Sequence, residues 1–202
     1  MIAMVDKQTV IGALQIIVTN LSQQADGHDI QAKVFESKGY SKLAKVYADH
    51  AAEERGFTMK MVERVLDIGG FLTNGAKIET PILDDPVECL KYDLATSVQG
   101  LAELDRVLPL VHDDVTTYEI LKDYYMDEEQ DMYWTETQLA LINEIGLQNW
   151  LVAQLRSSNS TGALRGASPY TNNIKIGGRG PGVSGRTRNP PIPSGPGRSP
   201  AR

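Results

Sequence analysis

Apolar residues recur at alternating spacings of three and four along four long segments, at about residues 7–37, 41–70, 86–111 and 115–146. This spacing places apolar side chains on one face of an α-helix, whereas a half-buried strand would need them at every second position. A shorter apolar stretch at about residues 147–155 predicts a fifth, short helix. The pattern therefore predicts an all-α protein.

The connection between the second and third segments runs from Phe71 to Asp85. It is too long for a tight helix hairpin and, with Pro81 inside it, too irregular for another helix. Pro86 suits the first turn of the helix that follows. Two helices, a long crossover and two more helices predict a four-helix bundle, with the fifth helix, over residues 1–155.

Polar residues interrupt the apolar stripes of these segments. His28 lies on the first stripe, His50 and Glu54 on the second, Ser97 on the third and Glu128 on the fourth. Carboxylates that point into a core need a cation or hydrogen-bond donors close by. The interior of the bundle is therefore the candidate functional site.

Composition changes abruptly at residue 156. Residues 156–202 contain no Asp or Glu, half of the 18 glycines and most of the ten prolines, so all 26 acidic residues lie in the body. A basic segment rich in Gly and Pro cannot bury a core, and we expect an extended tail that is disordered unless a partner binds it. Only Tyr170 offers a ring for base stacking, so nucleic acid is not favoured as the partner.

The single cysteine, Cys89, excludes an internal disulfide and a thiolate metal cluster within one chain. No apolar run reaches the roughly 18 to 20 residues that span a bilayer, and the first residues lack a basic segment followed by an apolar one. We expect a soluble, cytoplasmic protein without a membrane partner.

Two stretches of the body resemble bacterioferritin, a family of ferritin-like proteins. They are Ala51–Gly70, which ends in MVERVLDIGG, and Asp127–Leu139, which reads DEEQDMYWTETQL and continues in the family pattern through Ile145–Leu151. The resemblance covers about residues 5–155. It implies the four-helix bundle, a cage of 24 subunits that stores ferric mineral, haem bound by one methionine from each of two subunits, and a di-iron ferroxidase site in each bundle.

The resemblance also shows which ferroxidase ligands this chain has lost. A di-iron site takes about four carboxylates and two imidazoles, with Glu-x-x-His on two helices. Leu21 and Ser97 occupy the glutamate positions of the first and third helices, and the two motifs read Glu54-Arg55-Gly56-Phe57 and Glu128-Glu129-Gln130-Asp131. The surviving Glu54 and Glu128 match the metal-bridging pair. With three neighbouring acids and no facing imidazole pair, we predict that ferroxidase activity is lost.

Two interpretations of the surviving acids remain open. One is a single metal ion, such as weakly bound iron, held by Glu54, Glu128 and Asp131 with help from His28. The other is a network without metal, in which these carboxylates pair with Arg55, His50 or His28 or are partly protonated. Arg55 also occupies the haem methionine position, where a guanidinium cannot replace a thioether, so we do not expect haem.

Our leading hypothesis is a non-catalytic or weakly catalytic subunit of an iron-storage cage, built from copies of this chain or mixed with an active bacterioferritin-type subunit. A second hypothesis is a scaffold that uses its basic tail to bind another assembly. Ser160–Gly166 in the tail resembles the cargo-loading peptides that direct ferritin-like proteins into encapsulin shells; docking on acidic faces of neighbouring subunits and plain disorder are the alternatives for this tail. A third hypothesis is an enzyme with a mononuclear metal.

Overall fold

A computed structural model describes residues 6–155 of the chain, and the predicted basic tail at 156–202 lies outside this range. Its helices are α1 (Lys7–Ser37), α2 (Ser41–Asp67), α3 (Pro86–Val111), α4 (Val115–Ile145) and α5 (Leu147–Gln154). No strand occurs within the described range. The predicted all-α class, the four long helices and the short fifth helix are confirmed.

Short polar residues and glycines set the ends of these helices. Asp85 accepts hydrogen bonds from the backbone nitrogens of Val87 (2.7 Å) and Glu88 (3.1 Å), and Pro86 follows it in the first turn of α3. These contacts satisfy N–H groups that have no partner within the helix. Gly146 ends α4 and precedes α5. Its φ is 80°, a backbone conformation that glycine adopts readily and in which other residues are strained.

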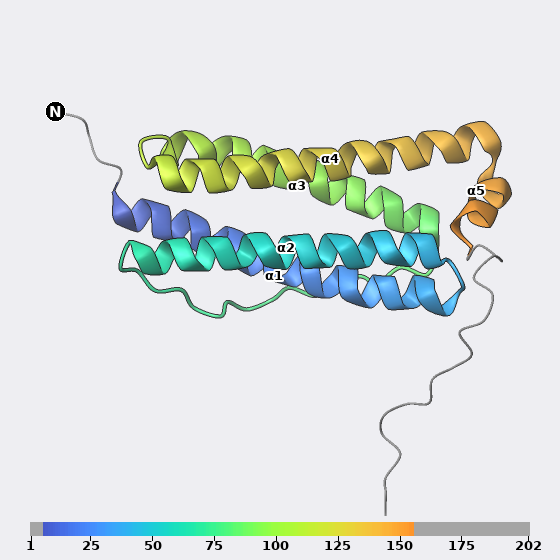
Figure 1. Ribbon diagram of the computed structural model, residues 1–202, viewed down its shortest axis with the longest axis horizontal. Helices are drawn as coiled ribbons and strands as arrows, with labels where there is room; N and C mark the ends of the chain where they lie inside the picture. Colours follow the sequence, from blue (N-terminus) through green and yellow to red (C-terminus); the bar gives the residue numbers. More distant parts are fainter. Residues whose placement is uncertain (1–5, 156–202) are drawn as a thin grey trace, which may run out of the picture. The chain divides into compact units, whose positions relative to one another are not determined.

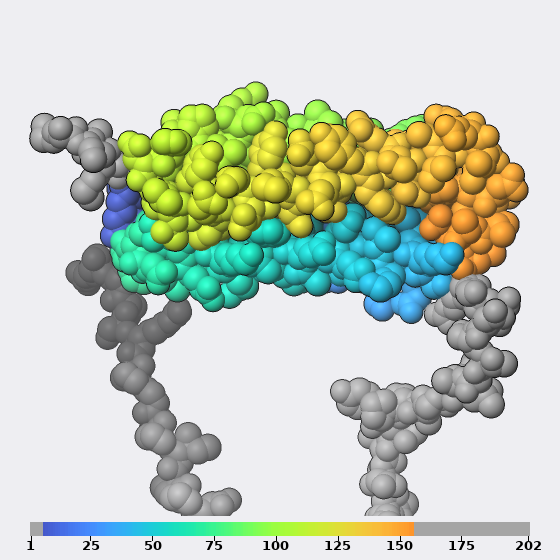
Figure 2. All heavy atoms as spheres, turned by 45° about the horizontal axis from the view of Figure 1, so that its top comes forward, coloured from blue at the N-terminus to red at the C-terminus, as the bar shows by residue number. Residues whose placement is uncertain are grey.

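The helices form two antiparallel pairs. α1 lies along α2, α3 lies along α4, and α5 closes one end (Figure 1). Seen from another side, α2 and α4 run next to each other along one face of the bundle (Figure 2). Within residues 6–155, no helix is long and apolar enough to cross a membrane.

The crossover at residues 71–85 is fastened to α1 by three glutamine side chains at every eighth position. Each side-chain amide both donates to and accepts from the main chain of one crossover residue, as a neighbouring peptide group would. The pairs are Gln15 with Thr73, Gln23 with Ile78, and Gln31 with Leu83. The long connection is thus held along the bundle, where the sequence predicted it.

Two apolar cores fill the bundle, one toward each end. One contains Leu14, Leu21, Met61 and Leu121, and the other contains Phe35, Leu43, Tyr47, Leu90 and Trp150. Each of the four long helices has residues in or against both cores. The segment of each helix that lies between the two cores includes polar side chains. A polar layer therefore crosses the middle of the bundle.

Candidate functional site

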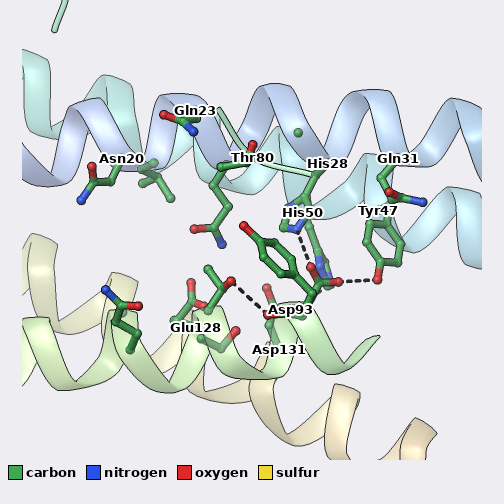
Figure 3. Close-up of a pocket in the computed structure, with 18 of the residues that line it drawn as sticks. Asn20, Gln23, His28, Gln31, Tyr47, His50, Thr80, Asp93, Glu128 and Asp131 are labelled. Atoms are coloured by element: carbon green, nitrogen blue, oxygen red, sulfur yellow. Dashed lines mark hydrogen bonds and ion pairs between the residues drawn. The ribbon is translucent and has the colours of Figure 1, made fainter. Parts of the chain in front are cut away.

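The polar layer gathers six ionisable side chains from all four long helices. They are His28 of α1, His50 and Glu54 of α2, Asp93 of α3, and Glu128 and Asp131 of α4. Five of these, all except Glu54, line a cavity of about 450 Å³. The labelled histidines extend from the α1–α2 pair toward labelled acids on the α3–α4 pair (Figure 3).

His28 lies between two carboxylates. Its Nδ1 is 2.9 Å from Oε1 of Glu54, and its Nε2 is 3.8 Å from Oδ1 of Asp93. The shorter contact is not aligned as a hydrogen bond, and Nδ1 has no hydrogen-bond partner among the described residues. Burial disfavours the imidazolium, but Asp93 and Glu54 outweigh burial and raise the pKa of His28 to about 10. His28 is therefore positively charged at neutral pH.

Asp93 is held in place from the apolar core below the layer. The hydroxyl of Tyr47 donates a hydrogen bond to Oδ2 of Asp93, and Sγ of Cys89 donates to the Tyr47 hydroxyl at 3.2 Å. The Tyr47 ring also meets the His28 ring edge-on, with centroids 5.4 Å apart. Asp93 is a site residue that we did not predict. The sequence contained a signal for it, because Asp93 lies four residues before Ser97 and therefore on the same face of the helix.

Glu54 and Glu128 are each 5% exposed. Burial raises the pKa of Glu54 to about 7 against the opposing effect of His28, and the nearby charge of Glu128 adds to the rise. Burial also raises the pKa of Glu128, which the hydroxyls of Ser97 and Tyr124 oppose. The Tyr124 hydroxyl donates to Oε2 of Glu128 at 3.3 Å. Two buried carboxylates thus share the neighbourhood of one imidazolium.

Asp131 has closer acid neighbours than the two we predicted. Its carboxylate, with those of Glu53 and Asp127, forms the one group of three in residues 6–155 whose ligand atoms all lie within 4.8 Å of one another. Burial and the charges of these neighbours raise the pKa of Asp131 to about 8. The three acids come from α2 and α4, the two helices that adjoin in Figure 2.

His50 lies beside this acidic group. Its Nε2 is 3.3 Å from Oδ1 of Asp131, and its ring centroid is 5.7 Å from that of His28. Burial and the charge of His28 lower the pKa of His50 to about 4, so its ring is neutral at pH 7. The expectation of an interior without facing imidazoles is therefore wrong. The layer holds two imidazoles and, with Asp93, more acids than expected.

The family positions for terminal iron ligands do not fit a di-iron centre. Leu21 is 1% exposed and belongs to an apolar core. Phe57 packs against the Tyr124 ring, with centroids 5.4 Å apart. Ser97 offers one neutral hydroxyl where a carboxylate would be needed. The imidazoles present, His28 and His50, lie about two helical turns away from Leu21 on α1 and from Phe57 on α2.

Arg55 does not reach the buried acids. Its Nη2 donates to Oδ1 of Asp26 (2.9 Å) and Oδ2 of Asp29 (2.5 Å) on α1, and its side chain is 47% exposed. Of the pairings considered for the interior acids, the structure places His28 next to Glu54 and His50 next to Asp131. A guanidinium tied to two carboxylates does not fit the role of haem ligand.

Comparisons with known proteins find similarity over most of the helical body. The ferritin-like domain family matches residues 13–145. A bacterial ferritin of Pseudomonas aeruginosa is 30% identical over 149 residues, which cover 72% of this chain and 96% of that protein. Bacterial ferritins of Synechocystis (29% over 161 residues) and Neisseria meningitidis (28% over 151 residues) cover 74% and 73% of this chain, and 97% of their own length.

Proposed function

Since this chain belongs to the ferritin-like family, as a divergent relative of the bacterial ferritins, we propose that it is a subunit of an iron-storage cage that does not oxidise iron at the family's di-iron positions. The observation that carries the proposal is the replacement of ligand positions by packed apolar side chains. Leu21 and Phe57 make core contacts where iron would need oxygen or nitrogen donors.

The retained bundle supports a structural role in an assembly. Several large apolar side chains of the described surface are exposed, among them Phe71 (85%), Ile78 (78%) and Val115 (68%). Exposed apolar surface of this kind marks sites of protein association. We infer that copies of this chain, or this chain and an active ferroxidase subunit, bury these side chains against one another. Iron would enter such a cage as its cargo.

A test for the catalytic part uses the chain purified without any sister subunit. Its rate of ferrous iron oxidation in air is compared with that of protein-free buffer and of a variant in which Leu21→Glu, Phe57→His, Ser97→Glu and Asp131→His restore the family ligands. We expect the wild type to match the buffer and the restored variant, once shown to be folded, to oxidise iron faster. Rapid oxidation and a ferric core with the wild type alone would refute the proposal.

A test for assembly uses native mass spectrometry of the particle isolated from its own cells. Two subunit masses in one particle support a mixed cage, and a single mass with many copies supports a cage of this chain alone. A monomer under the same conditions would argue against a storage role. The sole cysteine, buried and unpaired at position 89, is compatible with the reducing cytoplasm that we propose as the compartment.

The scaffold alternative depends on residues 156–202, which lie outside the described residues. Its support is the charge split of the sequence, because all acidic residues lie in the body and the charged side chains of the tail are all basic. Deleting residues 157–202 should leave the helical content of the bundle unchanged. Loss of a bound partner assembly, including an encapsulin shell, in the truncated protein would favour this alternative over simple storage.

A further inference from the structure

Two neighbouring buried side chains in the middle of the bundle each have a polar atom without an aligned hydrogen bond. Nδ1 of His28 and Oε2 of Glu54 are buried and lack hydrogen-bond partners among residues 6–155, although Nδ1 lies 2.9 Å from the other Glu54 oxygen. Glu54 is 5% exposed. Buried polar groups of this kind normally have a well-aligned partner, so these two atoms are available to a ligand that can take the place of the ion pair.

The separation of these atoms suits two donors to one metal ion. Zn²⁺ and similar ions bind imidazole nitrogen and carboxylate oxygen at about 2.0 to 2.2 Å. Two such donors on one ion lie about 3 Å apart when the angle between them is near 90°, and about 3.4 Å apart at the tetrahedral angle. The 2.9 Å between Nδ1 of His28 and Oε1 of Glu54 corresponds to an angle near 90°. A hydrogen bond would also have this length, but the alignment it requires is absent.

The other side of the His28 ring is oriented as in known metal sites. A histidine that binds metal through one nitrogen usually directs its second nitrogen to a carboxylate, which fixes the ring and its tautomer. Here Nε2 faces Asp93 at 3.8 Å, and Tyr47 holds Asp93 by a hydrogen bond. Asp93 is therefore a positioning residue. It leaves Nδ1 as the nitrogen that points toward Glu54.

A third acid and a neighbouring cavity complete the arrangement. Glu128, held by a long 3.3 Å hydrogen bond from Tyr124, is close enough to Glu54 for its charge to affect that carboxylate. It lines the same cavity of about 450 Å³ as His28 and Asp93. This volume has room for the water molecules that would fill the remaining coordination positions. Figure 3 shows this cavity with neutral polar side chains, such as Asn20 and Gln23, around it.

We propose that His28 and Glu54 bind one divalent transition-metal ion per chain, with Asp93 orienting the histidine and Glu128 contributing through water. The site uses Glu54 and Glu128, which match the family's metal-bridging pair, but His28 and Asp93 in place of the lost positions Leu21, Phe57 and Ser97. Mixed nitrogen and oxygen donors favour ions such as Fe²⁺, Co²⁺ or Zn²⁺ over Mg²⁺ and Ca²⁺, which prefer oxygen alone. The inference goes beyond the proposed function, because a storage subunit without oxidase activity can have or lack this site.

The direct experiment is a Co²⁺ titration of the full-length protein after treatment with a chelator. Visible absorption of bound Co²⁺ reports its coordination, and calorimetry reports the stoichiometry. We expect one ion per chain, displaced by Zn²⁺ and not by equal amounts of Mg²⁺. If the wild type binds no Co²⁺, the proposal is wrong whether or not any variant folds.

Variants locate the ion. Glu54→Gln and His28→Gln should each weaken Co²⁺ binding by about 100-fold or more, since each removes a donor, and Asp93→Asn by about 10- to 100-fold with a changed Co²⁺ spectrum. Glu63→Gln and His112→Gln are matched controls on exposed side chains and should change nothing. Circular dichroism verifies that each variant is folded.

The acidic group of Glu53, Asp127 and Asp131 on α2 and α4 is the alternative binding site that the variants must exclude. If Asp127→Asn abolishes Co²⁺ binding while His28→Gln leaves it intact, the ion binds to Glu53, Asp127 and Asp131 and the proposal is refuted. If Asp127→Asn has no effect and His28→Gln does, the proposal stands. Neither readout involves iron oxidation, so failure here is distinct from failure of the proposed storage function.

Discussion

Nδ1 of His28 on α1 lies 2.9 Å from Oε1 of Glu54 on α2, at the centre of the bundle, and the side chains are 13% and 6% exposed. Without metal, the imidazolium is the nearest positive charge to this buried carboxylate among the described residues. The imidazolium therefore compensates the negative charge of Glu54, as a metal ion would. The stability of the metal-free protein should depend on this pair.

Replacing His28 alone should destabilise the metal-free protein. His28→Leu leaves Glu54 buried without a cation, and the removal of one partner of such a pair costs about 3 kcal/mol or more. The double variant His28→Leu with Glu54→Leu should recover most of this loss, because no charge remains buried. Urea unfolding followed by circular dichroism measures both. Equal stability of wild type and His28→Leu would show that Glu54 does not depend on the imidazole.

Stability of the metal-free protein should fall as pH rises from about 6.5 to about 10. The folded-state pKa values of Glu54 (about 7), Asp131 (about 8) and His28 (about 10) all lie above their ordinary values. A group with a raised pKa binds a proton more tightly in the folded state, so its contribution is lost as pH rises through that pKa. Melting temperatures across this range test the prediction, and His28→Gln should flatten the most alkaline part.

His50 should act in the opposite direction at low pH. Its pKa is lowered to about 4, so the folded protein favours the neutral ring. The contribution of His50 is complete above about pH 6.5 and is lost as pH falls through 4. As pH falls from 6 to 4, protonation of Glu54 and Asp131 stabilises both proteins, and His50 opposes this gain only in the wild type. The stability of His50→Gln relative to the wild type should therefore increase over this range. Thermal melts over this range compare the two proteins, and an unchanged acid limb would contradict the assignment.

Asp131→Asn should stabilise the metal-free protein, and the gain should grow with pH. The neutral amide removes repulsion from Glu53, Asp127 and Glu128, while it keeps a polar atom near His50. We expect a gain of roughly 1 kcal/mol near pH 8. Asp123→Asn, at an exposed position of the same helix, is the matched control. A loss of stability at pH 8 would mean that Asp131 has a partner other than these acids.

A prediction away from the polar layer concerns the start of α4. Asp114 caps this helix by accepting from the backbone nitrogen of Thr117 at 3.3 Å, and Nη2 of Arg64, near the end of α2, donates to Asp114 at 2.5 Å. Asp114→Ala removes the cap and the half-buried ion pair, and should cost about 2 kcal/mol. Asp113→Ala removes only an exposed contact with His112 and should cost less than about 0.5 kcal/mol. Chemical denaturation of both variants tests the difference.

Arg55→Met should restore a haem ligand if this chain forms the two-subunit contact of its family. Arg55 pairs with the exposed Asp26 and Asp29, so its loss should have little effect on stability. After reconstitution with haem, we expect a Soret band in Arg55→Met and none in wild type or in the exposed control Arg106→Met. Haem binding by the wild type would contradict our interpretation of position 55.

The sequence by itself determined the helices and their order. Asp85 and Pro86 mark the start of α3, and Gly146 marks the boundary of α4 and α5, because caps and glycine conformations depend on residues close in sequence. Periodicity also placed His28, His50, Glu54 and Glu128 on inward faces. The sequence also showed which residues replace the family's ligands, since each ligand position belongs to a segment within one helix.

Only the tertiary structure decided which of these side chains meet. The approach of His28 to His50, the placement of Asp93 behind His28, and the grouping of Asp131 with Glu53 and Asp127 each join residues of different helices. Such contacts depend on how far one helix is shifted along its neighbour and on its rotation, and a shift of one turn brings a different residue to the same place. The apolar stripes constrain this register only through the packing of both cores at once, which no single segment of sequence contains.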